Sequence, residues 1–364
     1  MGSDHVFGVA LAPDRADTAL EPSSEKSVGA LQGRGLGRRR PAWTVREYRP
    51  GDERGILELF AAVFGGAARP RTLEDWVWEF ERNPAGREIV VAADPDGRIV
   101  AHFAMLPAAA VFEGTDVRCH QGVDSMVDPS VRREGAFLAV ARRAFETFGV
   151  ASRCAYGYGF PNETALSVGG KLLGYLPVAC PLVTLGRNFH GPDEPCGGAH
   201  DAVELTRLDA RVDRLWARLR GEVALGLRRD ARYLAWRYLE CPSAEYRVFA
   251  WPDGTGELRA LWVTRAGWMG RPILAVAELL CERRDAPAAE RALAHAMDVA
   301  RAAQQVRVEV WLPPSDPRFQ LARGLGFAPE PCGFRLAIRP YEPRLRADWA
   351  REHMSWSIGD ADAL

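Results

Sequence analysis

The two halves of the chain carry the same order of predicted elements, and this repetition limits the fold more than any other feature. In each half, apolar strands joined by tight turns precede a long amphipathic helix, which a further strand and a short helix follow. The turns are Asp-Pro-Asp-Gly at 94–97 and Pro-Asp-Gly at 252–254, and the long helices are predicted at 133–148 and 286–303. Turns of this composition between apolar runs are typical of antiparallel hairpins. Repetition of a whole unit therefore predicts two copies of one fold.

The predicted fold class is α/β, with two domains that each contain a mixed, mostly antiparallel sheet flanked by helices. We expect the first domain at 43–190 and the second at 201–345, because the stretch at 191–200 has the Gly- and Pro-rich composition of a linker. Residues 1–42 contain no apolar period that lasts a full helical turn, and Gly, Ser, Pro and charged residues dominate them. This composition predicts a flexible N-terminal tail.

Composition and charge exclude several classes of protein. The 364 residues include 47 basic and 48 acidic side chains, which argues against a nucleic-acid-binding protein because such proteins show a basic excess. No run of about 18 apolar residues is present and the N-terminus lacks the apolar core of a secretory signal, so we expect no membrane span and no export. The seven cysteines are dispersed and the histidines are not paired at metal-ligand spacing. We therefore expect a reduced, cytoplasmic protein without a metal.

The segment 123–137 is the most informative for chemistry. A buried strand is predicted to end at Val127-Asp-Pro129, and a loop with arginines and a glycine leads from it into the next helix. The N-terminus of a helix presents free backbone N–H groups and about half a positive charge. Gly135 would let an anion approach the backbone, and Arg132 and Arg133 would add fixed positive charge. This arrangement predicts a pyrophosphate site, although a simple turn with solvated arginines is compatible with the same residues.

This segment resembles the cofactor-binding motif of the GNAT superfamily, which comprises acyl-CoA-dependent acyltransferases. In that family a strand ends in Val-x-Pro-x-x-Arg, and Arg/Gln-x-x-Gly-x-Gly/Ala opens the next helix. The present chain has Val127-x-Pro129-x-x-Arg132 and then Arg132-x-x-Gly135-x-Phe137, with Phe137 in place of the small residue. The resemblance implies that the co-substrate is an acyl-CoA, expected to be acetyl-CoA. The residues that it implies at the cofactor are Met126, Val127, Arg132, Arg133, Gly135, Ala136, Phe137 and Asn162.

A second stretch resembles the family's signature Asn-x-x-Ala followed by Gly-Phe. Here it reads Asn162-x-x-Ala165, and then Leu173-Gly174-Tyr175. The resemblance implies that Asn162 borders the cofactor, while a structural role as a helix N-cap is compatible with the same residue. Many family members carry on this short helix a tyrosine that protonates the leaving thiolate. The nearest positions here are Gly169 and Gly170, so the usual acid is missing.

The second half also resembles the family, through Leu325-Gly326-Phe327 and the order of its strands. Its counterpart of the phosphate loop, Cys281-Glu-Arg-Arg-Asp-Ala-Pro287, contains no glycine. We therefore expect the second domain to be a degenerate copy that does not bind acyl-CoA. The resemblance extends over residues 43–340 and is specific in the first half only.

Aminolysis of a thioester requires a neutral amine, so a base or a water chain must take one proton. Asp124 is the first candidate, because it lies in an apolar strand near the expected thioester and burial makes a carboxylate more basic. A hydrogen-bonded structural carboxylate is the equally weighted alternative. Gln121 falls where some family members hold a catalytic Glu, but its amide cannot act as a base. His120 and Tyr158 are further candidates, although lone polar residues on strands more often satisfy local hydrogen bonds.

The C-terminal segment, residues 346–364, has a composition that predicts docking on the body of the protein. Trp349, Trp356 and Ile358 supply apolar side chains whose burial would hold the segment in place. Asp360 follows them, and docking would carry its carboxylate along. If the segment enters a groove between the domains, we expect Asp360 to bind a cationic acceptor or to assist its deprotonation. A segment packed far from the cofactor is the alternative.

Together these observations predict a cytoplasmic acyltransferase that transfers an acetyl group from acetyl-CoA to a small amine bound between the two domains. A metal, a nucleic acid and a membrane are not expected to take part. Two alternatives stay open: transfer to a hydroxyl or thiol, because nothing in the sequence fixes the nucleophile, and a non-catalytic acyl-CoA sensor, because the usual acid is missing. Transfer of an aminoacyl group from tRNA to a peptidoglycan precursor, which related tandem proteins perform, is disfavoured by the charge balance.

Overall fold

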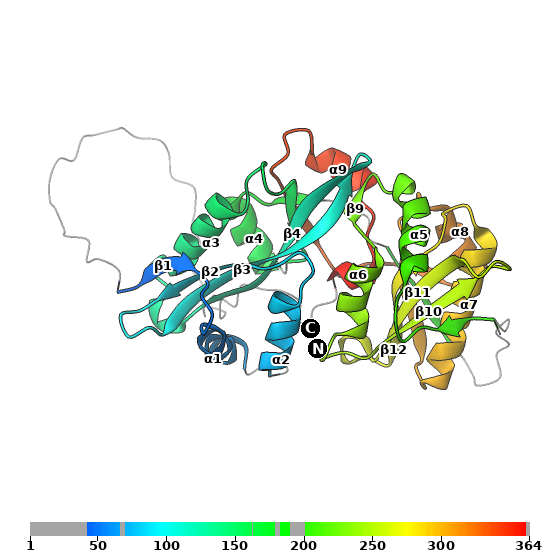
Figure 1. Cartoon of the computed structure of the whole chain (residues 1–364), viewed down its shortest axis with the longest axis horizontal. Helices are drawn as coiled ribbons and strands as arrows, with labels where there is room; N and C mark the ends of the chain where they lie inside the picture. The colour runs from blue at the N-terminus through cyan, green and yellow to red at the C-terminus, as the bar shows by residue number, and fades with distance from the viewer. Residues whose placement is uncertain (1–41, 66–69, 162, 179–182, 190–200, 362–364) are drawn as a thin grey trace, which may run out of the picture.

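The computed structural model describes residues 42–65, 70–161, 163–178, 183–189 and 201–361. These residues form two α/β halves, each built on one sheet, which lie side by side (Figure 1). The predicted class, two mostly antiparallel sheets flanked by helices, is thereby confirmed. The tail predicted at 1–42 (except for its last residue), the linker at 191–200 and Asn162 lie outside the described residues.

The first sheet has eight strands. They are β1 (Thr44–Glu47), β2 (Glu88–Ala93), β3 (Ile99–Phe112), β4 (Thr115–Val127), β5 (Tyr156–Gly159), β6 (Leu176–Val178), β9 (Leu225–Leu227) and β15 (Leu336–Pro340). Their order is β1-β2-β3-β4-β5-β15-β6, and β9 pairs with the C-terminal end of β3. All neighbours are antiparallel except β4 and β5, which are parallel. The β2–β3 and β3–β4 pairs are local hairpins, as the turn residues predict, whereas the other pairs join strands that are distant in sequence.

Helices cover both faces of the first sheet. They are α1 (Glu53–Phe64), α2 (Leu73–Trp76) with its π-helical continuation η1 (Val77–Glu81), the 3₁₀ turn η2 (Pro129–Val131), α3 (Ala136–Thr147) and α4 (Glu163–Leu173). The helices α1 and α2 pack against the face that contains Val91, and α3 and the end of α4 against the face that contains Val90. Because both faces are covered, every residue of a strand such as β2 is buried, and its residues 89–93 are all apolar instead of alternating with polar ones.

The second half repeats this arrangement. Its strands are β7 (Val183–Asn188), β8 (Val203–Glu204), β10 (Tyr246–Pro252), β11 (Leu258–Ala266), β12 (Ile273–Leu280), β13 (Arg307–Trp311) and β14 (Ala328–Pro331). Its helices and helical turns are α5 (Ala210–Leu219), η3 (Arg220–Glu222), α6 (Ala231–Leu234) with its π-helical continuation η4 (Ala235–Leu239), η5 (Trp268–Gly270), α7 (Ala286–Ala302) and α8 (Pro317–Gly324). The strand order is β14-β7-β13-β12-β11-β10-β8, with β12 and β13 as the parallel pair.

The two sheets exchange one strand each. β7, from the segment expected in the first domain (43–190), lies in the second sheet between β13 and β14. β15, from the segment expected in the second domain (201–345), lies in the first sheet between β5 and β6. Each half is therefore completed by a strand from the other, and the sheets do not follow the expected boundary. The side-chain pattern of a short strand shows that it is extended, but not which of two similar sheet edges it joins.

A pair of tryptophans marks an approximate twofold relation between the halves. Trp78 on η1 and Trp236 on η4 stack with their ring centroids 5.3 Å apart, and α2 and α6 face each other in the middle of the molecule (Figure 1). The indole Nε1 of Trp78 donates to the carbonyl oxygen of Trp236 at 2.6 Å, and the indole Nε1 of Trp236 donates to the carbonyl oxygen of Trp78 at 2.8 Å. Both helices begin six residues earlier, at the N-caps Thr72 and Asp230. Equivalent residues of the two repeats therefore contact each other here.

The C-terminal segment packs between the two halves. It contains α9 (Ala347–His353) and α10 (Ile358–Ala361). The Trp349 ring meets Phe112 of β3 edge-on, with the centroids 5.4 Å apart, and the Ser355 N–H donates to the Leu225 carbonyl of β9. Ile358 is completely buried. The segment therefore contacts strands and helices from both halves.

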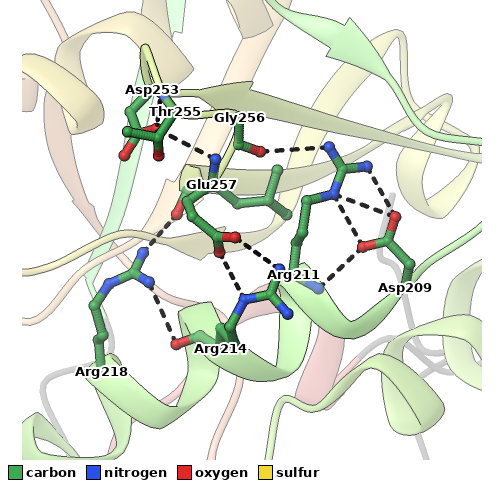
Figure 2. A network of polar contacts seen from close by, with 9 residues as sticks. Asp209, Arg211, Arg214, Arg218, Asp253, Thr255, Gly256 and Glu257 are labelled. Atoms are coloured by element: carbon green, nitrogen blue, oxygen red, sulfur yellow. Dashed lines mark hydrogen bonds and ion pairs between the residues drawn. The ribbon is translucent and has the colours of Figure 1, made fainter.

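Arginines on the outer face of α5 are paired with acidic side chains (Figure 2). Arg214 contacts both carboxylate oxygens of Glu257, at 2.7 and 2.8 Å, and Arg211 pairs with the N-cap Asp209 at 2.9 Å. Exposed pairs of this kind contribute little to stability. They do make the surface of α5 mixed in charge rather than basic. None of the helices in the described ranges is long and apolar enough to cross a membrane.

Candidate functional site

The strands β4 and β5 lie side by side for only a short distance. Their parallel pairing runs from Cys119↔Tyr156 to Gln121↔Tyr158, whereas β4 continues to Val127 and stays paired with β3. Beyond Gln121 the edge of β4 that faces β5 is outside the ladder, and its backbone groups are available to a ligand. We call this separation of the two strands the fork. A ligand in the fork would meet the end of β4 and the loop that follows it.

The loop after β4 brings a helix N-terminus to this end of the fork. Gly135 is the N-cap of α3 and has φ 81° and ψ 10°, a left-handed conformation that glycine adopts without strain. No side chain in the described part of the chain caps this helix, so its first N–H groups are left for an anion. A Cβ built on Gly135 would meet no atom within 4 Å, so the backbone is open to an approaching phosphate. The nearby Asp128 carboxylate is turned instead to the Ser130 N–H and to Arg98.

The two arginines beside this loop differ in exposure. Arg133 is exposed, whereas Arg132 is half-buried. The Nε atom of Arg132 is enclosed and has no hydrogen-bond partner among the described residues. A buried donor without a partner costs free energy, and a bound anion would relieve that cost. The loop thus combines positive charge, free N–H groups and an accessible backbone.

Four other residues predicted at the cofactor belong to the core around the loop. Met126 and Val127 are buried on opposite faces of β4, and Ala136 is buried at the start of α3. The half-buried Phe137 packs on Phe103, with the ring centroids 6.2 Å apart. Their side chains therefore serve packing, and their backbone groups are what a ligand could contact. The contact with Phe103 also accounts for a large residue at 137, where the motif has a small one.

The corresponding places in the second half are occupied by side chains of the chain itself. The N-cap of α7 is Asp285, whose carboxylate accepts from the Ala288 N–H at 3.1 Å and from Arg259 at 2.6 and 2.8 Å. The parallel pairing of β12 and β13 also ends early, at Ala275↔Glu309. There the largely buried Arg318 donates to the Leu279 carbonyl at 3.1 Å. A carboxylate thus takes the anion position, and a guanidinium lies against the unpaired part of β12.

Asp124 lies in the fork, but its carboxylate is already paired. It forms an ion pair with Arg71, a residue just before α2 that also pairs with Glu79. Its backbone has φ 47°, in a bulge where Asp124 and Ser125 together oppose one residue of β3. Because Arg71 engages this carboxylate, its oxygens are not free to contact a substrate amine. The geometry therefore agrees with the structural alternative for Asp124 and not with a free base.

His120 is enclosed within the first half. Its ring is completely buried, its Nε2 lies 3.0 Å from the Tyr341 hydroxyl, and its Nδ1 lies 3.5 Å from a Glu88 carboxylate oxygen. Burial lowers the pKa of His120, although Glu88 acts in the opposite direction. A neutral imidazole with both nitrogens engaged inside the core is placed for packing and hydrogen bonding rather than for contact with a substrate.

Tyr158 lies at the closed end of the fork, where β4 and β5 part. Its hydroxyl donates to the Gln121 side-chain oxygen across 3.4 Å. Burial, and after it the negative charge of Asp360, raise the pKa of Tyr158 well above its ordinary value. A tyrosine in this state stays protonated at neutral pH, so it can donate a proton or a hydrogen bond but cannot act as a base.

Asp360 does not present a free carboxylate to the fork. The residue is 3% exposed, and its two carboxylate oxygens accept hydrogen bonds from Arg229 at 2.7 and 2.8 Å. One of them, Oδ2, also accepts from the Ser357 N–H at 2.9 Å. A carboxylate neutralised in this way cannot bind a cationic amine as the sequence interpretation expected. The segment does reach the fork through Trp356, whose ring centroid lies 5.6 Å from that of Tyr158.

The residue that the sequence interpretation missed at the fork is Tyr175. Its hydroxyl is buried, with no hydrogen-bond partner among the described residues. A Cβ built on Gly122 of β4 would lie 3.2 Å from this hydroxyl, and one built on Gly157 of β5 would lie 3.3 Å from it. Because neither glycine has a side chain, the Tyr175 hydroxyl has room between the two strands. The sequence offered one signal, a tyrosine where the resembling signature has Phe, but not the direction of its hydroxyl.

Comparison with known proteins agrees with this geometry. The family described as "Acetyltransferase (GNAT) domain" matches residues 44–164, a range that includes the whole fork and the loop. Residues 44–164 are therefore similar to a GNAT acetyltransferase domain. None of the curated proteins is significantly similar to the chain in sequence. Within the described ranges, no group of three His, Cys, Asp or Glu side chains is arranged to hold a metal ion.

Solved structures share the fold over both halves. A GCN5-related N-acetyltransferase from Kribbella flavida has a TM-score of 0.60 and 18% identity, over 82% of this chain and 72% of its own. A probable N-acyltransferase from Enterococcus faecalis has a TM-score of 0.59 and 12% identity, over 82% and 73%. The N-myristoyltransferase of Saccharomyces cerevisiae, solved with bound myristoyl-CoA, has a TM-score of 0.56 and 10% identity, over 85% and 84%. At such identities the likeness establishes the GNAT fold.

Proposed function

We propose that this protein is an acyl-CoA-dependent acyltransferase whose first half binds the co-substrate. The observation that carries the proposal is the position of α3. Its uncapped N-terminus, at Gly135, comes shortly after the end of β4, the strand that separates from β5. The pyrophosphate of CoA would bind the N–H groups of this helix, and the pantetheine arm would run from there into the fork. The family match over residues 44–164 supports the same placement.

In this proposal the side chains and the backbone of the site have separate roles. Arg132 and Arg133 neutralise phosphate charge, and the N–H groups at the start of α3 donate hydrogen bonds to it. The unpaired edge of β4 takes up the amide groups of pantetheine as a neighbouring strand would. We also propose that Asn162 borders the cofactor, as the resemblance implies. The residues proposed to contact CoA are therefore Met126, Val127, Arg132, Arg133, Gly135, Ala136, Phe137 and Asn162.

We propose acetyl as the acyl group and a small amine as the acceptor, which reaches the fork between the two halves. Trp356, Tyr158 and Phe160 present aromatic rings on that side. The neutral amine attacks the thioester carbonyl, the C–N bond forms, the C–S bond breaks, and the amine nitrogen releases one proton to water. The CoA thiolate takes up one proton from the Tyr158 hydroxyl, which is protonated at neutral pH, and Tyr158 then regains one proton from water.

A non-catalytic acyl-CoA sensor is the second candidate, and two observations favour it. Gly169 and Gly170 on α4 stand where the resembling enzymes carry an acid. Both carboxylates considered as bases, Asp124 and Asp360, are ion-paired with arginines. A protein without a proton acceptor would bind acyl-CoA and retain it. The two candidates therefore differ in turnover and not in binding.

Release of the CoA thiol from acetyl-CoA distinguishes them. We expect thiol release that increases with the concentration of an amine in a panel. At limiting acetyl-CoA, Gly135→Asp should lower this release at least tenfold. Alcohols and thiols tested beside the amines decide between N-, O- and S-transfer. Tight acetyl-CoA binding without release, with every acceptor class, would establish the sensor instead. Absence of acetyl-CoA binding would contradict both candidates.

A further inference from the structure

Asp124 adopts a backbone conformation that needs support from its surroundings. Its φ of 47° lies in the left-handed region, which L-residues rarely adopt. The other non-glycine residues with positive φ in the described ranges, Glu113, Met269 and Gln304, lie in turns or helix ends and not within a strand. A strained residue inside a central strand persists only where neighbouring groups hold it, and such strain is typical of functional sites.

Two side chains from different parts of the chain hold Asp124, one at its backbone carbonyl and the other at its carboxylate. The imidazole Nδ1 of His102, on β3, donates to the Asp124 carbonyl oxygen across 2.7 Å. The Arg71 guanidinium pairs with the Asp124 carboxylate. Arg71 is itself fixed by Glu79 and lies over the rings of Phe60 and Phe80, 5.4 and 5.5 Å from their centroids. Through these contacts the bulge is linked to α1, η1 and β3.

His102 acts on the bulge and not on a substrate. Its acceptor is a carbonyl oxygen, so the proton of the neutral ring must be on Nδ1. Burial lowers the pKa of His102, which keeps the ring neutral, and the nearby Arg71 acts in the same direction, whereas Asp124 opposes it. The ring is completely buried and faces Phe80, so no substrate atom can reach it from the fork.

The corresponding strand of the second half, β12, has no such left-handed residue. Arg229, the counterpart of Arg71 before α6, pairs with Glu278 of β12. The pairing of β11 with β12 is also irregular at Val263/Thr264, yet no residue of β12 has a positive φ. The strained bulge is therefore confined to the half in which the helix N-terminus is uncapped. A purely structural bulge would not need to differ between the halves in this way.

We propose that His102 and Arg71 are positioning residues, which hold the Asp124 bulge so that the unpaired edge of β4 is aligned with the acyl group in the fork. The proposal rests on the proposed acyltransferase function and adds to it which residues set the geometry of the reaction. Without the hydrogen bond from His102, Asp124 would relax toward regular strand conformation and shift the N–H groups beyond Gln121 along the fork. Binding of the CoA phosphates, at the other end of the site, would not change.

Substitution of His102 tests this directly. His102→Phe keeps a ring of similar size and removes the donor, whereas His102→Asn offers an amide N–H close to the position of Nδ1. We expect kcat with acetyl-CoA to fall at least tenfold in His102→Phe, with the affinity for free CoA within twofold of wild type. His102→Asn should recover most of the lost rate. The matched control is His295→Phe, on α7 of the second half, which should leave kcat unchanged.

A second variant keeps the test valid if His102→Phe folds poorly. Glycine adopts a φ of 47° without strain, so Asp124→Gly should make the rate insensitive to the donor. The double variant Asp124→Gly/His102→Phe should then match Asp124→Gly in kcat. Full activity of His102→Phe, equal loss in folded His102→Asn and His102→Phe, or a crystal structure of His102→Phe with an unchanged bulge would each overturn the proposal. Failure of wild type to release thiol would instead count against the acyltransferase function, and the crystal structure would still decide on the bulge.

Discussion

At the scale of single residues, the molecule contains two similar clusters in which one arginine binds two carboxylates. Arg71 pairs with Glu79 and Asp124, and Arg229 pairs with Glu278 and Asp360. Each arginine directly precedes a helix N-cap, and in each half the paired tryptophan comes six residues after that N-cap. Where the first half has Glu79, the second has Arg237, which donates to the Gly359 carbonyl. The carboxylate missing from the second cluster is thus supplied by the C-terminal segment.

The first prediction concerns Asp124→Asn. Asparagine tolerates positive φ and keeps an oxygen for Arg71, so the bulge should persist while one charge of the ion pair is lost. We expect kcat to fall less than tenfold, and the free energy of unfolding to fall by about 1–3 kcal/mol. Steady-state kinetics and urea unfolding measure the two quantities. A loss of a hundredfold or more in kcat with unchanged stability would show that Asp124 is the base after all.

The second prediction concerns Asp360→Ala. Removing this carboxylate leaves Arg229 buried with only Glu278 as an anionic partner. Loss of one partner from a buried ion pair destabilises a protein by about 3–5 kcal/mol, so the melting temperature should fall clearly. The matched control is Asp348→Ala, because Asp348 forms an exposed pair with Arg346 and its loss should leave the melting temperature unchanged. A normal melting temperature combined with a large loss of kcat in Asp360→Ala would support the catalytic role that the sequence suggested.

At the scale of elements, the two halves differ in how the long helix begins. Gly135 leaves the N-terminus of α3 open, whereas Asp285 caps α7 and is held there by Arg259. An N-cap carboxylate satisfies the same N–H groups that a phosphate would use, so the cap and an anion exclude each other. The same fold can therefore carry a binding site in one half and a closed helix end in the other.

The third prediction follows from the capped helix. Asp285→Ala should lower the free energy of unfolding by about 1 kcal/mol, which is typical of a lost N-cap. It should not create a second CoA site, because Arg318 still lies against the unpaired part of β12. Thermal unfolding and CoA titration of the variant measure both effects. Binding of two CoA molecules to this variant would mean that the cap alone keeps the second half closed.

Much of the element order could be predicted from the sequence, but not its irregular parts. Apolar periodicity and turn residues predicted a helix at 133–148, where α3 spans Ala136–Thr147, and they predicted both hairpins. They predicted separate strands at 99–106 and 111–112, where the structure has one continuous β3. The bulge at Asp124 could not be predicted, because it depends on two residues distant in sequence, Arg71 and His102. Periodicity and turn residues describe neighbours in sequence and do not indicate such long-range contacts.

The same limit applied to the candidate site. The loop around Gly135 could be proposed as an anion site because the helix start, the glycine and the arginines are neighbours in sequence, and its role in binding stays a prediction. The roles expected of Asp124 and Asp360 could not be judged, because an arginine elsewhere in the chain decides whether a carboxylate is free. The identity of a side chain indicates what chemistry it can do, and its partners decide whether it does so.

At the scale of the whole molecule, the two halves are tied together in three ways. They exchange β7 and β15, they share the reciprocal hydrogen bonds of Trp78 and Trp236, and the C-terminal segment contacts both. Neither sheet is complete without the other half. The proposed acceptor site therefore lies between both copies of the repeat, although only one of them is proposed to bind CoA.

The fourth prediction is that the protein unfolds as one unit. Because each sheet contains a strand from the other half, neither half can unfold while the other stays intact. We expect a single transition in urea, with coincident curves from tryptophan fluorescence and far-ultraviolet circular dichroism. Two separated transitions, or fluorescence and circular dichroism curves with different midpoints, would contradict the interlocked arrangement.

The central claim is that the first half alone binds acyl-CoA, through the open N-terminus of α3. Calorimetric titration with CoA tests it most directly, on the wild type, on Gly135→Asp and on Arg284→Ala, which removes an exposed arginine from the corresponding loop of the second half. A carboxylate at 135 would repel the pyrophosphate and block its approach to the backbone. We predict one CoA per chain for the wild type and for Arg284→Ala, and an affinity at least tenfold weaker for Gly135→Asp, a loss of about 1.4 kcal/mol or more. Two CoA molecules per wild-type chain, or an unchanged affinity of Gly135→Asp, would contradict the claim.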